Sequence, residues 1–220
     1  PNPATVSIPD PATDEIDEAE SDLSSSNDNG DVSAISGNSL DSTCDPCVLP
    51  AGGYYIDTSV TLDGSENLTF RTDGGTVELY IAGDIQIQNQ ATVEIEGEGE
   101  VKIYADGNYD MLNDAKIVNP DDRADQFWVY MRPGTDATLS NQAQLRGVIF
   151  GPENDTAQVD ISVDNKFKSF GALVGGVSST SNNNEIHYDE ALEETEVFGA
   201  GTTRPKVTYL HISVTEVKVE

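Results

Sequence analysis

The stretch YIAGDIQIQNQATVEI, residues 80–95, alternates apolar and polar residues on both sides of a polar corner that contains Asn89. The same pattern returns in YADGNYDMLNDAKIV (104–118), YMRPGTDATLSNQAQLRGV (130–148) and ISVDNKFKSFGALV (161–174). The corner asparagines are 24, 28 and 24 residues apart: Asn89, Asn113, Asn141 and Asn165. The chain therefore repeats one short unit of strands and turns.

A repeat of this length, built from short strands, predicts a β-solenoid in which each coil stacks on the next through parallel ladders. A propeller blade needs about 40–45 residues, and a leucine-rich repeat would show a leucine ladder that this chain lacks. Weaker copies at 54–70 and 177–192 bring the expected number to about six coils. The predicted fold is thus all-β, a short parallel β-helix of about six irregular coils with one short N-terminal helix and a long C-terminal strand. An irregular antiparallel β-sandwich is the alternative, because alternation alone fits both.

Each recurring residue has an expected role in such a coil. Asparagine tolerates the left-handed conformation of a corner, and stacked asparagines can form a side-chain ladder. The small alanine two residues later lets the chain bend inward. The apolar residues expected to face inward and pack in rows along the axis are Ile81, Ile87, Val93, Ile103, Met111, Ile117, Val129, Leu139 and Leu145.

Residues 1–50 form the first predicted region, an acidic extended segment, a short helix and a disulfide loop. Ile16, Ala19 and Leu23 share one helical stripe, with acidic residues in the first turn. Cys44 and Cys47 in TCDPCVLP fit a redox site, half of a zinc site or a structural disulfide. We favour the disulfide, because nearby aspartates would raise a thiol pKa and the two histidines lie in strand-like contexts. A disulfide indicates an oxidising, extracellular setting.

The second predicted region is the repeat domain, residues 51–192, and the third is a connector and C-terminal β-strand, residues 193–220. The segment KVTYLHISVTEVKVE (206–220) reads as one long strand that must pair with something. It caps the solenoid, docks elsewhere on the molecule or pairs with a neighbouring subunit. The candidate subunit-contact residues are Tyr209, Leu210, Ile212, Val214, Val217 and Val219.

The charge restricts the partners. The chain has 40 Asp and Glu against 11 Lys and Arg, a formal net charge of −29. Such a surface repels phosphate backbones and anionic headgroups, so we predict no nucleic-acid or acidic-membrane partner. Concentrated salt makes the self-repulsion tolerable, since screening acts over roughly 3 Å at 1 M. We therefore expect adaptation to high salt, with general solubility as the alternative.

Other signals are few. No run of about 18 apolar residues is present, so no membrane span is expected in this chain. Asn67 in NLT and Asn154 in NDT are glycosylation candidates. We predict no cofactor; scattered carboxylates leave Ca²⁺ open, although no EF-hand loop occurs.

No catalytic or metal-binding residue is predicted. The chain lacks GxSxG, HExxH and a phosphate-cradling glycine loop. The acidic cluster at 121–125 reads as a solvated loop, and Trp128 lies in the continuous apolar run FWVYM, which indicates a buried strand rather than a sugar platform. His187 and Asp189 share a strand face with no nucleophile beside them. We therefore predict that the protein is not an enzyme.

Several segments resemble a domain of haloarchaeal secreted surface proteins, many of them pilin-like. They are GGYYIDTSVTL (52–62), GDIQIQNQATVEIEGEGEVKIYADG (83–107), RGVIFGPENDTAQVDI (146–161), FGALVGG (170–176) and IHYDEAL (186–192). The resemblance implies an extracellular, cell-surface location. The expected function is a non-enzymatic structural protein, a subunit of or component associated with a pilus-like filament, whose partners are further copies or other filament subunits. The alternative is a carbohydrate-binding adhesin or a polysaccharide-active β-helix enzyme, for which glycans are the partners.

Overall fold

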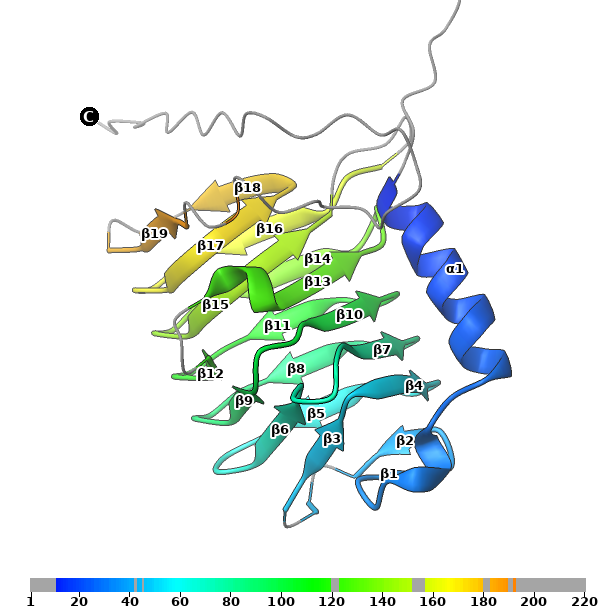
Figure 1. Cartoon of the computed structure of the whole chain (residues 1–220). Helices are drawn as coiled ribbons and strands as arrows, with labels where there is room; N and C mark the ends of the chain where they lie inside the picture. Colours follow the sequence, from blue (N-terminus) through cyan, green and yellow to red (C-terminus); the bar gives the residue numbers. More distant parts are fainter. Residues whose placement is uncertain are drawn as a thin grey trace, which may run out of the picture.

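The computed structural model describes residues 11–41, 43–44, 46–119, 123–151, 157–179, 183–189 and 192. These residues form one α-helix, α1 (Pro11–Ser25), two short 3-10 helices, η1 (Asn29–Asp31) and η2 (Ala124–Gln126), and nineteen strands. Figure 1 shows the strands stacked along one axis, with α1 lying across one side of the stack. Residues 193–220, with the candidate subunit-contact strand, lie outside the described part, as does Asn154.

The strands form the three faces of a parallel β-solenoid of about 5 turns. The first face contains β4 (Gly52–Ile56), β7 (Val77–Ile81), β10 (Val101–Ala105) and β13 (Phe127–Met131). The second contains β5 (Val60–Leu62), β8 (Ile85–Ile87), β11 (Tyr109–Met111), β14 (Asp136–Leu139), β16 (Asp160–Val163) and β18 (Gly176–Ser179). The third contains β3 (Val48–Pro50), β6 (Asn67–Arg71), β9 (Thr92–Glu96), β12 (Lys116–Val118) and β19 (Glu185–Tyr188).

Two long strands, β15 (Gln144–Phe150) and β17 (Lys168–Val174), run from the third face of one coil into the first face of the next. The first half of β15 pairs with β12 and its second half pairs with β13. Among the described strands, only the hairpin of β1 (Ile35–Ser36) and β2 (Ser39–Leu40) pairs antiparallel. The parallel ladders confirm the predicted β-helix and exclude the sandwich. The predicted six coils are close to the number observed.

The interior of the solenoid is a continuous apolar column. All nine residues that the sequence predicts to face inward are buried, with at most 5% of their surface exposed. The parallel register places like positions on one another, so that Ile87 lies beside Met111 and Met111 beside Leu139. No coil can bury its own inward face alone, and stacking removes each face from water.

The outer surface of the first face is also buried, because α1 covers it. Ile16, Ala19 and Leu23 pack onto outward-pointing aromatic side chains of the strands, which confirms the predicted helix and its apolar stripe. The register aligns these outward side chains in one row: Tyr55, Tyr80, Tyr104, Tyr130, Phe150 and Val174. Two neighbouring pairs in this row stack, Tyr55 with Tyr80 and Tyr104 with Tyr130, each with ring centroids 5.3 Å apart, and Tyr130 meets Phe150 edge-on. The strand FWVYM is therefore buried on both sides.

The helix runs along the solenoid axis, from β13 to β4. Near its start, Asp17 forms an ion pair with Arg132, which follows β13, at 2.9 Å. Near its end, Leu23 lies against Gly53 of β4, where an added Cβ would lie 2.6 Å from Leu23 Cδ2. The helix thus ties four coils together from outside.

The two ends of the solenoid differ. At the β4 end, the side-chain amide of Asn29 bonds both the N–H and the carbonyl of Tyr55, at 3.1 and 2.7 Å, and Asp28 accepts from Gly53 N–H at 2.9 Å. These bonds occupy the strand edge, and the β1–β2 hairpin packs Ala34 and Ile35 against the core. Cys44 and Cys47 form the predicted disulfide beside this end. We call this the sealed end.

At the opposite end, β18 and β19 are the last described strands, and no other described strand pairs with their outer edges. Val177 and Ile186 are 44% and 40% exposed there. The helix α1 begins toward this same end (Figure 1). We call this the open end.

Candidate functional site

The corner between the second and third faces is the candidate ligand site, and it is built from consecutive left-handed residues. In each of four coils the asparagine and the residue after it both have positive φ, for example Asn141 at 57° and Gln142 at 68°. In three of these coils an alanine N–H donates to the carbonyl of the residue before the asparagine and closes the turn, as Ala143 N–H does to Ser140 at 3.3 Å. Positive φ at both central positions defines a type I′ turn, which favours asparagine at its first central position.

The asparagines form a continuous ladder of side-chain hydrogen bonds. Asn165 Nδ2 donates to Asn141 Oδ1 at 3.0 Å, Asn141 to Asn113 at 2.9 Å, and Asn113 to Asn89 at 2.9 Å. The ladder ends at Asp63, whose carboxylate accepts from Asn89 Nδ2 at 2.6 Å. All four bonds point the same way along the axis, so the ladder fixes the register between coils.

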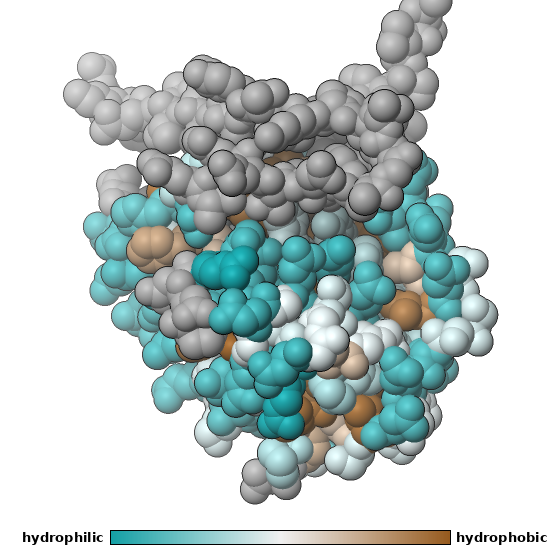
Figure 2. Space-filling model, in the orientation of Figure 1, coloured by the Kyte–Doolittle hydropathy of each residue, from teal (hydrophilic) through white to brown (hydrophobic). Residues whose placement is uncertain are grey.

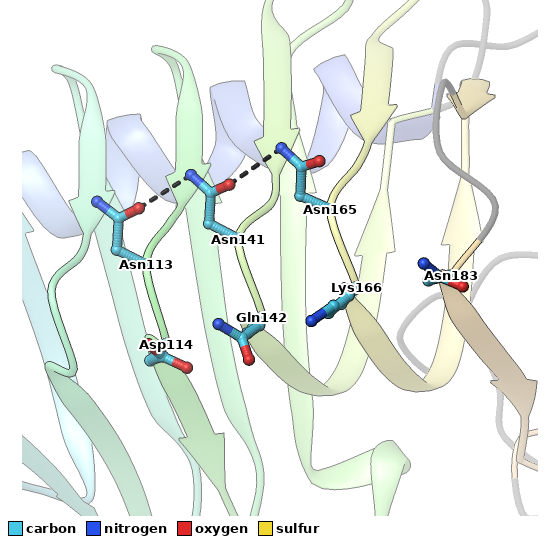
Figure 3. A pocket seen from close by; sticks show the side chains of 7 residues that line it. All are labelled: Asn113, Asp114, Asn141, Gln142, Asn165, Lys166 and Asn183. Carbon is cyan, nitrogen blue, oxygen red and sulfur yellow. Dashed lines mark hydrogen bonds between the residues drawn. The ribbon is translucent and has the colours of Figure 1, made fainter.

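A second row of polar side chains runs beside the ladder, and these side chains form no hydrogen bond or ion pair with other described residues. The residues are Asp114, Gln142 and Lys166, each following a ladder asparagine (Figure 3). Their backbones belong to the turns, yet none of the three side chains has a hydrogen bond or ion pair within the part of the chain that the structure describes. With the ladder and Asn183 they line an open hollow of about 440 Å³.

The second row can bind polar ligands. A carboxylate accepts hydrogen bonds, an ammonium donates them, and an amide does both. In successive coils these groups recur about every 4.8 Å, the strand spacing of a sheet. An extended molecule rich in hydroxyl groups could therefore bond several coils at once. This row was not predicted from the sequence, although its signal was present as the residue that follows each corner asparagine.

The other polar residues that the sequence draws attention to have structural roles. Arg123 pairs with Asp125 at 2.7 Å and with Glu98 at 3.5 Å, and Asp125 carbonyl accepts from Trp128 Nε1 at 2.8 Å. Asp189 carboxylate accepts from the N–H of Ala124 at 3.1 Å. The loop around η2 is thus held in place from both sides. Asp121 and Asp122 lie outside the described residues.

His187 stacks on Phe170, with ring centroids 4.8 Å apart, and the Arg146 guanidinium lies over Phe170 at 5.2 Å from its centroid. Phe170 is 43% exposed, yet both of its ring faces are covered. Sugar stacking needs an open ring face, so Phe170 does not supply one. His187 therefore packs on Phe170, and the Asp189 carboxylate bonds the backbone of Ala124.

Asn67, the described glycosylation candidate, is exposed at the start of β6. Among the residues that the structure describes, no three His, Cys, Asp or Glu side chains gather closely enough to hold a metal ion. No helix in the described part of the chain is both long and apolar enough to cross a membrane.

These features define the molecule as an acidic parallel β-solenoid with one sealed end, a helix strapped along its outside and an amide-lined corner. The chain belongs to the family described as a domain of unknown function (DUF7305), whose model matches residues 4–195. No curated protein and no solved structure matches it.

Proposed function

We propose that this protein is a non-enzymatic, extracellular structural component of a cell surface, a subunit of or an attachment to a pilus-like filament, adapted to high salt. The observation that carries the proposal is the polarity of the solenoid. The disulfide and the β1–β2 hairpin lie at one end of the solenoid, and β18 and β19 are the last described strands at the other. A rod attached through the end that carries β18 and β19 would display its sealed end outward.

The sealed end is suited to an exposed tip. The Asn29 and Asp28 side chains occupy the β4 edge, so that edge does not present free N–H and C=O groups to other strands. The disulfide restrains the loop beside it in an oxidising environment. Sealing one end also means that simple end-to-end stacking of solenoids does not extend a polymer, because head-to-tail growth needs two free ends. Attachment to the filament then involves the open end.

The surface supports the high-salt setting. Hydrophilic side chains cover most of the described surface in Figure 2. The described cations Arg71, Lys102, Arg123, Arg132 and Lys168 each lie within ion-pair distance of a carboxylate, so few positive charges remain to offset 40 acidic residues. The remaining carboxylates repel one another, and salt screens that repulsion. The resemblance to haloarchaeal secreted proteins supports the same environment.

Electron microscopy of the native protein on its own cells, kept in molar salt and labelled with gold-conjugated antibody, tests the proposal. Gold along surface filaments is the expected result. Label confined to the cell interior, or to the medium as single particles, would overturn it.

The hollow at the corner favours a second function, the binding of a surface or matrix glycan. The second row supports this function, because Asp114 and Lys166 line the hollow and their side chains form no hydrogen bond or ion pair with the residues that the structure describes. A glycan array with the whole protein tests it. A bound glycan should lose affinity at least about tenfold in Asp114→Ala and Lys166→Ala, as expected for loss of hydrogen bonds to charged groups. Lys116→Ala, on the exposed third face, is the matched control. Equal binding by all variants would place the glycan elsewhere.

A further inference from the structure

We propose that a second copy of this chain binds side by side with the first, with the outer face of its helix α1 against the third face of the solenoid. The contact deepens the proposed filament role and rests on it, because it names surfaces that join one copy to the next. The surface on the third face is formed by outward side chains of β12, β15 and β17. We call it the third-face patch, and its residues are Lys116, Val118, Arg146, Lys168 and Phe170.

The strand register makes this patch one continuous surface. Lys116 pairs with Gln144, and Gln144 pairs with Lys168. Two residues further along the same strands, Arg146 pairs with Phe170. Side chains two residues apart in a strand lie on the same side of the sheet, so all of these side chains project outward together.

The patch has an exposed apolar centre that is already ordered. Val118 is 37% exposed, and Phe170 is also exposed although its two ring faces are covered. The Arg146 guanidinium lies over one face of the Phe170 ring, and the His187 ring stacks on Phe170. Arginine and aromatic side chains are enriched at protein interfaces, and ordered side chains lose little freedom on binding. The centre of the patch therefore has the composition of a protein contact.

The patch is basic although the chain as a whole is strongly acidic. The charged outward residues of β12, β15, β17 and β19 are Lys116, Arg146, Lys168 and Glu185, for a net charge of 3 − 1 = +2. Glu185 pairs with Lys168 at 3.2 Å, whereas the Lys116 ammonium forms no ion pair with the residues that the structure describes. A basic surface favours an acidic partner.

The outer face of α1 is such an acidic surface. The helix contains six Asp and Glu and no Lys or Arg. Asp14, Glu18 and Asp22 are exposed and four residues apart, so they form one stripe along the helix. None of these three carboxylates forms an ion pair with another described residue. Like charges at this spacing repel one another, and a basic partner would relieve that repulsion.

The stripe and the patch match in direction and length. A helix rises about 1.5 Å per residue, so the stripe from Asp14 to Asp22 is about 12 Å long. Strands lie about 4.8 Å apart, so Lys116 and Lys168, two strands apart, are separated by about 10 Å. Both rows run along the solenoid axis, because α1 lies along the stack of strands (Figure 1). Two copies with aligned axes can therefore place the stripe on the patch.

The contact joins two different surfaces, so every bound copy keeps a second surface for the next one. Such heterologous contacts build rings or open filaments. Molar salt favours this contact, since screening over roughly 3 Å suppresses the repulsion between two bodies of net charge −29 but leaves touching opposite charges attracted.

Light scattering of the purified whole protein in molar NaCl tests the contact. The wild-type mass should rise with concentration. Lys116→Glu/Lys168→Glu reverses the patch and Glu18→Lys/Asp22→Lys reverses the stripe, so each variant alone should need at least about tenfold more protein to associate. An equimolar mixture of the two variants should associate like the wild type, because each reversed surface then meets a surface of opposite charge.

Arg71→Glu is the matched control, since Arg71 lies on the same face but outside the patch, and this variant should associate like the wild type. Near-UV circular dichroism of the stacked tyrosines reports whether each variant is folded, and Lys116→Gln and Glu18→Gln, which should weaken association, replace a variant that is not. A monomeric wild type, a reversed variant that associates like the wild type, or a mixture that stays monomeric would overturn the contact. Because association is measured in solution, the contact and the cell-surface role can each fail alone.

Discussion

Gly171 lies directly against Gly147 in the next coil, so close that a Cβ atom on Gly171 would sit 1.9 Å from the Gly147 carbonyl oxygen. The two residues pair in register where β15 and β17 bend from the third face into the first. Both have positive φ, 153° for Gly147 and 137° for Gly171. The bend that joins two faces by one continuous strand therefore requires glycine in both coils.

Gly171→Ala should destabilise the protein by at least about 3 kcal/mol, because the clash is with rigid backbone and the φ value disfavours a side chain. Gly64→Ala is the matched control. Gly64 has φ 65° and open space around its Cβ position, so only the left-handed penalty of about 1 kcal/mol applies. Urea denaturation measures both. Similar losses for the two variants would contradict the close approach at Gly171.

Tyr109→Phe should stabilise the protein by about 1 kcal/mol. The Tyr109 hydroxyl is fully buried and has no hydrogen-bond partner among the described residues, and an unpaired buried hydroxyl is costly. Tyr54→Phe should instead cost about 1 kcal/mol, since the Tyr54 hydroxyl donates to the Pro50 carbonyl at 2.8 Å. Thermal unfolding should move the two midpoints in opposite directions. A lower midpoint for Tyr109→Phe would show that its hydroxyl is satisfied.

Asn141 combines two roles that substitutions can separate. Asn141→Gly keeps the left-handed turn but removes the bonds to Asn113 and Asn165, for an expected cost of about 1–2 kcal/mol. Asn141→Ala should cost about 1 kcal/mol more, because alanine disfavours positive φ. The difference between the two variants in chemical denaturation measures the turn strain. Equal stabilities would mean that the ladder bonds alone fix the corner.

Reduction of the Cys44–Cys47 disulfide should lower the free energy of unfolding by roughly 2 kcal/mol, the chain-entropy value for a short loop. The double variant Cys44→Ser/Cys47→Ser should show the same loss without reductant and no further change when reductant is added. Proteolysis should then increase at the sealed end. Unchanged stability in both experiments would show that the hairpin packing alone seals that end.

Alkaline pH should unfold the protein through its tyrosines. Burial, followed by the nearby carboxylates of Asp28 and Asp31, raises the pKa of Tyr54 to about 12, and burial with Glu20 raises the pKa of Tyr80 to about 12. Burial also raises the pKa of Tyr104, Tyr109 and Tyr130. Because these folded-state values exceed the unfolded value of about 10, the stabilisation is complete below pH about 10 and is lost as pH rises through the folded values.

Tyrosinate absorbance and circular dichroism, followed together, check this dependence. A late absorbance rise should coincide with loss of the fold. Tyr109→Phe should reduce the slope of stability against pH above 10 by about 1.4 kcal/mol per unit, the contribution of one proton. An early rise of all tyrosines in a folded protein would contradict the burial.

The repeat, the parallel coils and the inward rows follow from the sequence, because period-two alternation and the recurring Asn–Xaa–Ala corner are local properties. The helix and its buried stripe are equally local. The second row at the corner was not predicted, because the recurring asparagine marks only the first of the two residues that this turn type places in the left-handed region.

Which residues of each coil face inward, and where each coil turns, can thus be read from local sequence patterns. What covers the outside of the coils cannot, because it depends on how distant segments pack. The tyrosine row that includes Tyr80, Tyr104 and Tyr130 points away from the core and is buried by α1, a helix that lies more than 50 residues earlier in the chain. Alternation assigns a side chain to one face of a strand, but whether that face meets water depends on contacts between distant segments. The same holds for the two ends, since side chains of η1 seal one edge while the other edge stays open among the described strands.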